Sequence, residues 1–311
     1  NDLQFAAQMG ATHVVLQSYA NAGIVPGDER WEYDDLVQLR QRVEDAGLVL
    51  EALENVPLKF YDQVMLGGPD RDRQIENMVY TVRNIARAGI PIFGYHWMPT
   101  LVGRTSLATE IRSGSRVTAF DLTQAKKDPL LMDRRYTENE MWENLEHWIK
   151  IIIPVAEQEG IRIGIHPCDP PVAELQGIPQ LFRSFEAYKR LISIVESPSN
   201  CIEFCQGTFS EMEDAKGDGI YEMIEYFGER DKILYVHFRN VSETVPSFRE
   251  EFINTGYVDM YRAMQTYKKV GFEGMFVDDH VPVVVGDSPW GHRGRAFANG
   301  YIQALMDVVE S

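Results

Sequence analysis

The sequence predicts an α/β fold, and within that class an eight-stranded (β/α)8 TIM barrel, from three observations. Short β-branched or apolar runs alternate with stretches of helical period along the 311 residues, which favours βαβ units and a parallel sheet. Polar residues of the metal-ligand type end successive runs, at the edge where parallel barrels place their sites. No Gly-rich phosphate loop follows any run, which disfavours the alternative of an open, doubly wound nucleotide-binding sheet.

Seven runs are predicted to be strands of one sheet. They are Thr12 to Leu16, Val49 to Asn55, Pro91 to His96, Arg162 to His166, Cys201 to Cys205, Ile233 to Phe238 and Gly274 to Asp278. Helical period covers Trp31 to Ala46, Asp72 to Ala88, Glu138 to Glu159, Ser184 to Ser197, Gly219 to Phe227 and Met260 to Val270. Asp2 to Gln8 also indicates a helix, so we expect the eighth, first strand of the barrel to lie before Asn1.

The length suits one barrel domain, and we expect residues 1–311 to form it alone. One connection, from Pro99 to Arg135, is too long for an ordinary βα loop. We expect this segment to form a lid or wall over the site.

Charge and cysteine content exclude several classes of partner. The formal net charge of −17 repels phosphate backbones, so nucleic acids and anionic membranes are not expected partners. No apolar run reaches the roughly 18 residues that a membrane span needs. Three cysteines in a long chain argue against a disulfide framework and favour the reducing cytoplasm. Because barrels of this kind often associate, we expect a homo-oligomer.

Four successive strand ends carry the side chains that transition metals prefer. They end in His166, in Cys205, in His237 and in the pair Asp278-Asp279. A lone histidine or cysteine at such a place is usually part of the core, but imidazole, thiolate and carboxylate groups on neighbouring strands converge at a barrel mouth. The sequence therefore predicts a divalent metal site.

Three further residues near these strand ends have weaker signals. Cys201 lies deeper in its strand and is expected to be core, while Cys168 either lines the site or is passive. Glu203 either supports a ligand as its hydrogen-bond partner or forms an ion pair inside the barrel.

A set of short motifs, in order along the chain, resembles the mannonate dehydratase family. The motifs are GYHWMP, RT, AFD, IIPVAE, IHPCDPP, GIPQ, CQG, HFRN, GYVDM and DH. The resemblance implies a xylose isomerase-like TIM barrel that binds manganese or a similar divalent ion, with iron, cobalt and zinc as alternatives. It also implies a small acidic sugar as substrate: the family removes water from D-mannonate to give 2-keto-3-deoxygluconate in hexuronate (glucuronate) catabolism.

The family's functional residues fall on particular positions here. The resemblance places the metal ligands on His166, Cys205, His237 and Asp279, which selects Asp279 over Asp278. It implies that His280 is a catalytic acid/base and that Arg239 takes part beside it. A guanidinium can pair with a carboxylate in a bidentate way, so substrate contacts are expected from Arg104, and also from His96 and Arg295. For Arg104 and Arg239, a structural salt bridge is the alternative.

Two departures from the family pattern keep other functions open. The family's catalytic tyrosine falls on Trp290, which has no hydroxyl; Tyr95, Tyr257 or His292 would have to replace it. The family's Asp-Asp after His-Pro is Cys168-Asp169 here. The alternatives are a dehydratase of a related sugar acid, a metal-dependent sugar isomerase or epimerase on the same barrel, and a sugar-acid binding protein without activity.

Overall fold

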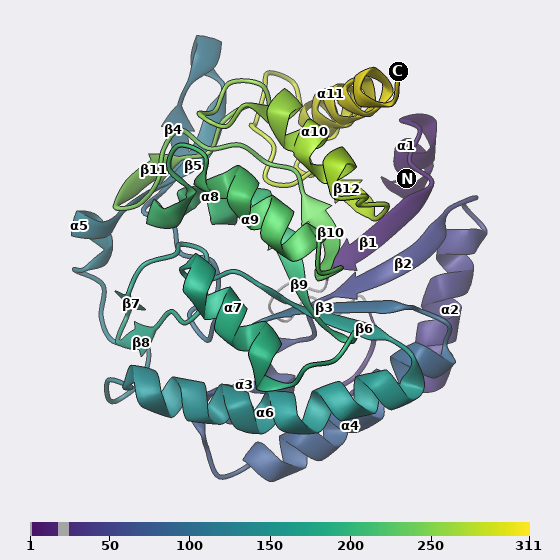
Figure 1. Ribbon diagram of the computed structural model, residues 1–311, viewed down its shortest axis with the longest axis vertical. Coiled ribbons are helices and arrows are strands. Elements are labelled where there is room, and N and C mark those ends of the chain that lie inside the picture. The colour runs from purple at the N-terminus through teal and green to yellow at the C-terminus, as the bar shows by residue number, and fades with distance from the viewer. Residues whose placement is uncertain (1, 18–24) are drawn as a thin grey trace. The chain divides into compact units, whose positions relative to one another are not determined.

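The computed structural model describes residues 2–17 and 25–311, and it contains a sheet of seven parallel strands (Figure 1). The hydrogen-bonded order is β1-β2-β3-β6-β9-β10-β12, so the strands follow one another in the sheet as they do in the sequence. This is the order that repeated βαβ units produce. Asn1, before which an eighth strand is expected, lies outside the described residues.

All seven predicted strands are present, with ends shifted by one residue at most. Their bounds are β1 His13–Gln17, β2 Val49–Glu54, β3 Ile92–His96, β6 Arg162–His166, β9 Asn200–Cys205, β10 Ile233–His237 and β12 Met275–Val277. Because β12 ends at Val277, the acidic pair Asp278-Asp279 and His280 follow the strand rather than ending it.

The predicted helices are also found, with ends that differ by up to three residues. They are α1 Asp2–Gln8, α2 Tyr33–Glu44, α4 Arg71–Arg87, α6 Glu138–Glu159, α7 Phe185–Ile194, α9 Gly219–Gly228 and α10 Met260–Lys269. The pattern did not predict the last helix, α11 His292–Glu310, nor the short helices α3 Asp62–Leu66, α5 Leu122–Ala125 and α8 Gln206–Glu211, nor the 3-10 turns η1 Leu58–Phe60, η2 Arg112–Gly114 and η3 Glu213–Ala215.

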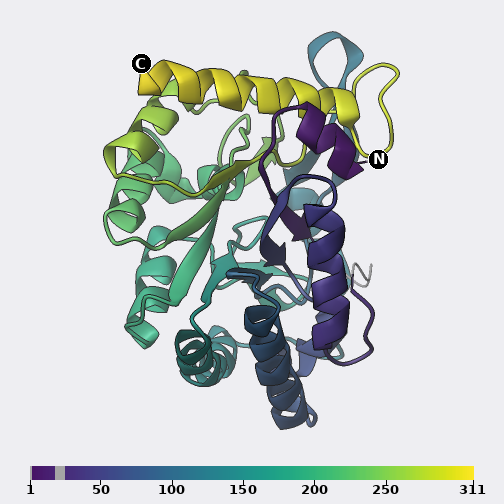
Figure 2. The ribbon, with the colours of Figure 1, turned by 90° about the vertical axis from the view of Figure 1, so that its right-hand side faces the viewer.

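The chain divides into two compact units, and β9 continues from the first into the second. The first unit comprises Asn1–Leu101, Tyr136–His166 and Tyr188–Ile202. It holds β1, β2, β3 and β6, with α2 beside β2 (Figure 2) and α4 beside α6 (Figure 1). The second unit comprises Val102–Arg135, Pro167–Ala187 and Glu203–Ser311.

Helix α6 is the clearest case of local sequence fixing an element of the first unit. Thr137 caps its N-terminus in a capping box: its hydroxyl accepts from the Glu140 N–H, and the Glu140 carboxylate accepts from the Thr137 N–H. Gly160 ends the helix in the left-handed conformation that glycine adopts most readily. Its buried face places Trp148 against Tyr95, whose hydroxyl accepts from the indole Nε1 at 3.0 Å.

The long connection from Pro99 to Arg135 has secondary structure of its own in the second unit. Strands β4 Ser106–Glu110 and β5 Arg116–Asp121 pair antiparallel, and β11 Ser247–Arg249 completes a three-stranded sheet in the order β11-β5-β4. The short strands β7 Glu174–Leu175 and β8 Ile178–Pro179 form a hairpin. That the connection covers the site remains a prediction.

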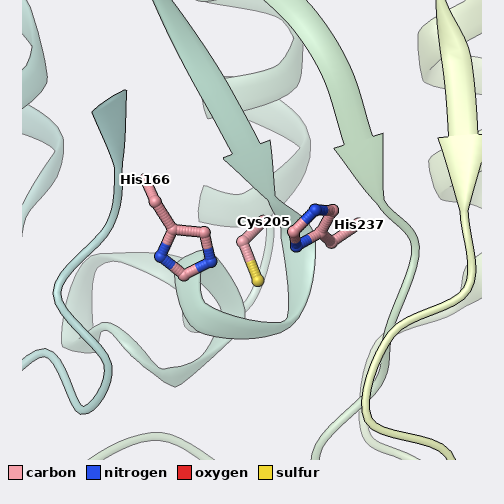
Figure 3. A group of neighbouring side chains, drawn as sticks. All are labelled: His166, Cys205 and His237. Carbon is pink, nitrogen blue, oxygen red and sulfur yellow. The ribbon is translucent and has the colours of Figure 1, made fainter. Parts of the chain in front are cut away.

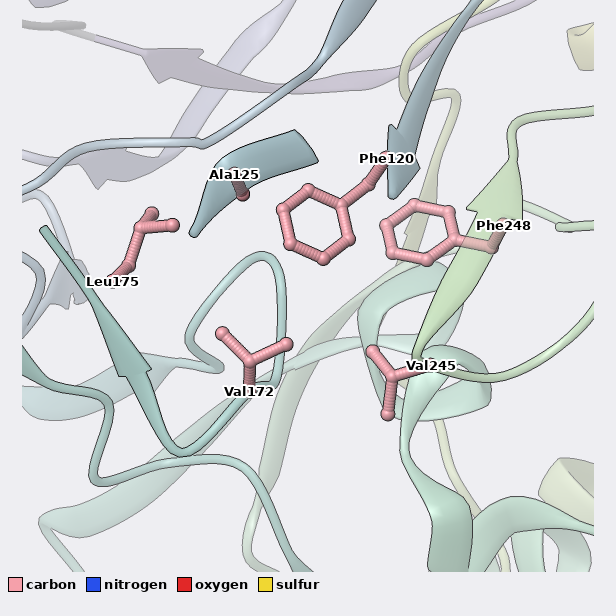
Figure 4. Packing of buried hydrophobic residues seen from close by; sticks show 6 residues of the cluster. All are labelled: Phe120, Ala125, Val172, Leu175, Val245 and Phe248. Carbon is pink, nitrogen blue, oxygen red and sulfur yellow. The ribbon is translucent and has the colours of Figure 1, made fainter. Parts of the chain in front are cut away.

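A small apolar cluster anchors the three-stranded sheet (Figure 4). Phe120 of β5 and Phe248 of β11 lie ring to ring, with centroids 5.8 Å apart. The other members are Ala125, Val172, Leu175 and Val245. The cluster therefore holds β11 in place, and with it the residues that follow β11.

None of the described helices combines the length and the apolar composition that a membrane span requires.

We expect the change Trp148→Ala to destabilise the fold by about 3–5 kcal/mol, because removing a buried aromatic side chain loses its transfer free energy and leaves a cavity. The indole is fully buried and packs against Tyr61, Tyr95 and Trp97. The measurement is the urea-unfolding midpoint. Tyr261→Ala is the control, since Tyr261 is 41% exposed, and equal midpoints for both variants would contradict this account.

Candidate active site

Three of the four predicted metal ligands form one buried group (Figure 3). His166 ends β6, Cys205 ends β9 and His237 ends β10. Their side chains turn toward one another, and one ligand atom from each lies within 4.8 Å of the others. Parallel neighbouring strands explain this convergence, because their carboxyl ends lie at the same edge of the sheet.

The fourth predicted ligand, Asp279, lies beside two members of this group. Its Oδ2 is 3.8 Å from the Cys205 sulfur and 3.8 Å from Nδ1 of His237. Imidazole nitrogen, thiolate sulfur and carboxylate oxygen together suit a divalent transition metal such as manganese, iron, cobalt or zinc. The described residues thus supply the donor types of a metal site, although their ligand role remains a prediction.

The sulfur of Cys205 lies beside two hydrogen-bond donors. Cys205 is the N-cap of α8, and its sulfur accepts from the Thr208 N–H at 3.5 Å. The guanidinium of Arg239 donates to the same sulfur at 3.6 Å. A helix N-terminus and a neighbouring cation both stabilise a thiolate, which is the form that binds metals.

Arg239 is the centre of a buried ion network that also contains this cysteine. Its side chain is almost inaccessible to solvent, and each of its three guanidinium nitrogens donates to the protein. Nε donates to Asp279 Oδ2 at 2.9 Å and Nη1 donates to Glu211 at 2.9 Å. Nη2 donates to the Thr208 hydroxyl at 2.9 Å and to Asp169 at 3.1 Å.

Arg104 belongs to the same network. Its guanidinium pairs with both oxygens of Asp169, and Nη2 donates to Glu250 Oε1 at 2.8 Å. The two arginines hold the pKa of Asp169 well below its usual range, although burial opposes this. The IHPCDPP and RT motifs therefore meet in a buried salt bridge. We call Arg104, Arg239, Asp169, Glu211, Glu250, Asp279 and Cys205 the Arg239 network.

Within the Arg239 network, the pKa of Glu211 is raised well above its ordinary value. Burial is the largest cause, and the charge of Asp169 adds to it, against the attraction of Arg239. The neutral form is thus favoured at Glu211, whereas the pKa of Glu250 is lowered to about 2 despite its burial, by His280 and the arginines.

The CQG motif has a steric explanation. A Cβ on Gly207 would lie 2.4 Å from Nε of Arg239, closer than side-chain atoms approach. Only glycine lets the guanidinium lie against the first turn of α8. The CQG motif therefore has two roles: Cys205 supplies the thiol, and Gly207 leaves the space that the Arg239 guanidinium occupies beside it.

His280 follows Asp279 and lies at the border of this network. Its Nδ1 is 2.6 Å from Oε1 of Glu250, and its Nε2 is 3.5 Å from Oδ1 of Asp279. Burial lowers the pKa of His280, but the two carboxylates outweigh burial, and the pKa lies above its ordinary value.

Glu203 lies on the other side of His237. Its buried Oε1 is 3.4 Å from Nε2 of His237, while Nδ1 of the same ring lies on the side of Asp279. A carboxylate on the second nitrogen of a ligand histidine fixes the ring, so this geometry favours the supporting role over a separate ion pair.

Two predicted substrate contacts have other hydrogen-bond partners. His96 ends β3 in the first unit; it is buried, and its Nδ1 accepts from the Met98 N–H at 3.2 Å. Burial and the neighbouring His166 lower the pKa of His96 to about 3, so its ring is neutral. Arg295 pairs with Asp278 at 2.7 Å and lies over the ring of Trp290.

The residues considered as substitutes for a catalytic tyrosine have other partners. Trp290 is 39% exposed, and its ring lies 4.9 Å from that of His292. The hydroxyl of Tyr95 lies against Trp148, and that of Tyr257 donates to the Ser210 carbonyl. Burial raises the pKa of both tyrosines. Within the described residues, neither tyrosine hydroxyl forms a hydrogen bond to His280 or to the proposed metal ligands.

Several motif residues have structural roles. Asn240 of the HFRN motif donates to the carbonyls of Ile253 and Val258 and accepts from Val258 N–H, which ties it to the GYVDM motif. Cys201 is buried, as predicted, and its thiol donates to the Pro198 carbonyl. Burial raises the pKa of Cys168 to about 12, so its thiol is not readily ionised.

Three members of this site were not predicted from the sequence: Thr208, Glu211 and Glu250. Thr208 could have been found, because it follows the CQG motif at the start of a helix. Glu211 and Glu250 carry no comparable signal, since each is one acidic residue among the 47 Asp and Glu of the chain.

Comparisons with known proteins agree with the resemblance to the mannonate dehydratase family. The chain matches the D-mannonate dehydratase (UxuA) family over residues 2–132 and 124–311. It is 33% identical to a mannonate dehydratase of Streptococcus agalactiae serotype V over 315 aligned residues, which cover 92% of this chain and 89% of the relative.

Solved structures agree on the fold. A mannonate dehydratase from Streptococcus suis serotype 2 superposes with a TM-score of 0.88 at 28% identity, covering 99% of this chain and 90% of that one. A xylose isomerase-like TIM barrel protein from Mycobacterium smegmatis, 12% identical, superposes with a TM-score of 0.63 over 99% of this chain and 88% of that one. The predicted xylose isomerase-like barrel fold is confirmed, and the chain belongs to the D-mannonate dehydratase family.

Proposed function

We propose that this protein is a metal-dependent hydro-lyase that converts D-mannonate to 2-keto-3-deoxygluconate. The reaction removes a proton from the carbon next to the carboxylate and a hydroxyl from the following carbon, so one water is lost and the enol product becomes the keto acid. The observation that carries the proposal is the buried donor group of His166, Cys205 and His237, with Asp279 beside it, in a chain of this family.

The charges around the donor group support a divalent cation. The Arg239 network gathers the carboxyl groups of Asp169, Glu211, Glu250 and Asp279 and the thiol of Cys205 around two guanidinium groups. These acidic groups outnumber the two arginines, and a divalent ion would offset part of the excess. Manganese is our first choice of metal, and iron, cobalt and zinc fit the same donors.

His166, Cys205, His237 and Asp279 would hold a divalent ion, which would supply Lewis-acid stabilisation of the charge that develops on the substrate oxygens. His280 moves a proton: its Nε2 lies on the side of Asp279, and its Nδ1 is bound to Glu250. Glu203 holds the ring of His237.

The two arginines act mainly through protein carboxylates in this proposal. Arg239 fixes Asp279 and the Cys205 sulfur, and Arg104 fixes Asp169. Direct contact of Arg104, His96 and Arg295 with the substrate carboxylate or hydroxyls remains part of the proposal. We also propose a homo-oligomeric enzyme of the cytoplasm, in keeping with three free, buried thiols.

The direct test is a keto-acid assay on the manganese-loaded protein with D-mannonate. We expect one molecule of keto acid per molecule of substrate, and no product after removal of the metal by a chelator. Epimeric aldonic acids and aldoses are assayed beside it, because Trp290 stands where the family has a tyrosine. Turnover of another sugar acid alone, or isomerisation without loss of water, would move the assignment to those alternatives.

Removal of the thiol tests the metal site. We expect the change Cys205→Ser to weaken binding of Mn²⁺ by more than about 10–100-fold, the loss that follows when a group supporting a ligand is removed. Metal content by mass spectrometry and chelator competition measure this. Cys201→Ser is the matched control, because Cys201 is equally buried in the same strand but bonds a backbone carbonyl. Equal metal content in both variants would exclude Cys205 as a ligand.

A second variant tests the steric role of the CQG motif. In Gly207→Ala the new methyl group displaces Arg239, so we expect metal affinity to fall by about tenfold or more. Chelator competition again measures the affinity. Gly300→Ala is the control, since a Cβ there meets nothing within 4 Å and the residue lies in α11. Unchanged affinity in Gly207→Ala would show that the position of Arg239 does not matter to the ligands.

A further inference from the structure

We propose that Glu250 is the positioning residue of His280: it holds the imidazole by Nδ1 and leaves Nε2 as the nitrogen that exchanges a proton with the substrate. This rests on the proposed acid/base role of His280. It adds a residue, and the choice of one ring nitrogen, that neither the motifs nor the resemblance indicates.

The two ring nitrogens have unequal partners. Nδ1 is 2.6 Å from Glu250 Oε1, a short contact of the kind found between a histidine and a carboxylate. Nε2 is 3.5 Å from Asp279 Oδ1, which is too long for a good hydrogen bond. The ring is therefore fixed on one side, and the other side lies toward the proposed metal ligands.

His280 needs such a contact because little else among residues 2–17 and 25–311 orients its ring. It follows β12 by three residues and lies outside the ladder of the sheet. Its φ is +42°, a region that non-glycine residues seldom adopt without support from their surroundings. Its side chain is 35% exposed, so without a partner the ring would be free to turn about its side-chain bonds.

Glu250, by contrast, is rigidly held. Its side chain is buried, and Oε1 also accepts from Arg104 Nη2 at 2.8 Å and from Arg239 Nη1 at 3.4 Å. Its backbone N–H donates to the Thr118 carbonyl at 3.0 Å, which extends the pairing of β11 with β5. Phe248, two residues earlier, is part of the apolar cluster in Figure 4.

The carboxylate thus comes from the three-stranded sheet and not from a strand of the parallel sheet. A rigid carboxylate on one nitrogen of a catalytic histidine fixes both the orientation of the ring and the nitrogen that carries the proton. Glu250 is the carboxylate on Nδ1 of His280, and Nε2 faces Asp279 without a good hydrogen bond.

Glu251 offers a matched control, because it is the neighbouring carboxylate, its side chain is only 9% exposed, and it pairs with Arg249 at 2.8 Å. The test uses Glu250→Met and Glu251→Met, which remove each carboxyl at similar side-chain length, and Glu250→Gln, which keeps an acceptor. All are measured as the metal-loaded enzyme, with metal content determined for each.

For Glu250→Met we expect kcat to fall by about a hundredfold or more, because proton transfer by a positioned side chain contributes about 10²–10⁴-fold. KM should change little, and Glu250→Gln should recover part of the loss. In a His280→Asn background, Glu250→Met should cause no further fall in kcat. Equal losses in Glu250→Met and Glu251→Met, or a further fall in the His280→Asn background, would overturn the proposal.

A second readout does not depend on activity. In the zinc-loaded, ¹⁵N-histidine-labelled protein, the ring signals that vanish in His280→Asn should show a proton on Nδ1 in the wild type and lose that signature in Glu250→Met. Signals that are identical in both proteins would overturn the proposal. If no sugar acid is dehydrated but the signature changes as expected, the proposed reaction fails while the contact between Glu250 and His280 stands.

Discussion

The buried guanidinium of Arg239 is the interaction on which the rest of the site depends. It donates to Asp279, Cys205, Asp169, Glu211 and Glu250. Burying such a charge is costly, and leaving it without a partner costs about 3–5 kcal/mol. The surrounding groups are therefore held in place before any metal or substrate binds, which is the preorganisation that electrostatic catalysis requires.

Two kinds of element bring groups to this centre. The parallel sheet supplies the proposed ligands His166, Cys205 and His237 at strand ends, where the register of neighbouring strands sets their spacing. Segments outside the parallel strands supply Arg104, Asp169 and Glu250. The strand-end residues are suited to bind an ion. Arg104, Asp169 and Glu250 set the charge and the orientation of the side chains around that ion site.

Periodicity and strand-end chemistry predicted the seven strands, seven helices and the ligand candidates, because these depend on local pattern and on the geometry common to parallel sheets. The sheet β11-β5-β4 was not predicted, since β11 has only three residues and pairs with a strand far away in the sequence. Glu250 was not predicted either, because it follows β11 and its position depends on the same long-range pairing. Arg104 and Arg239 were recognised by type, but their carboxylate partners depend on tertiary packing, which residue spacing alone does not indicate.

Arg104 precedes β4 and Glu250 follows β11, so both depend on the three-stranded sheet, and this limits how the barrel can be recombined. An exchange of residues 99–135 with a relative would replace Arg104 and β5, but it would leave β11 and Glu250 to pair with a foreign strand. The pairing of β11 would then no longer place the Glu250 carboxylate next to His280. Chimeric enzymes of this family should therefore exchange both segments together, as one module, if the histidine is to keep its partner.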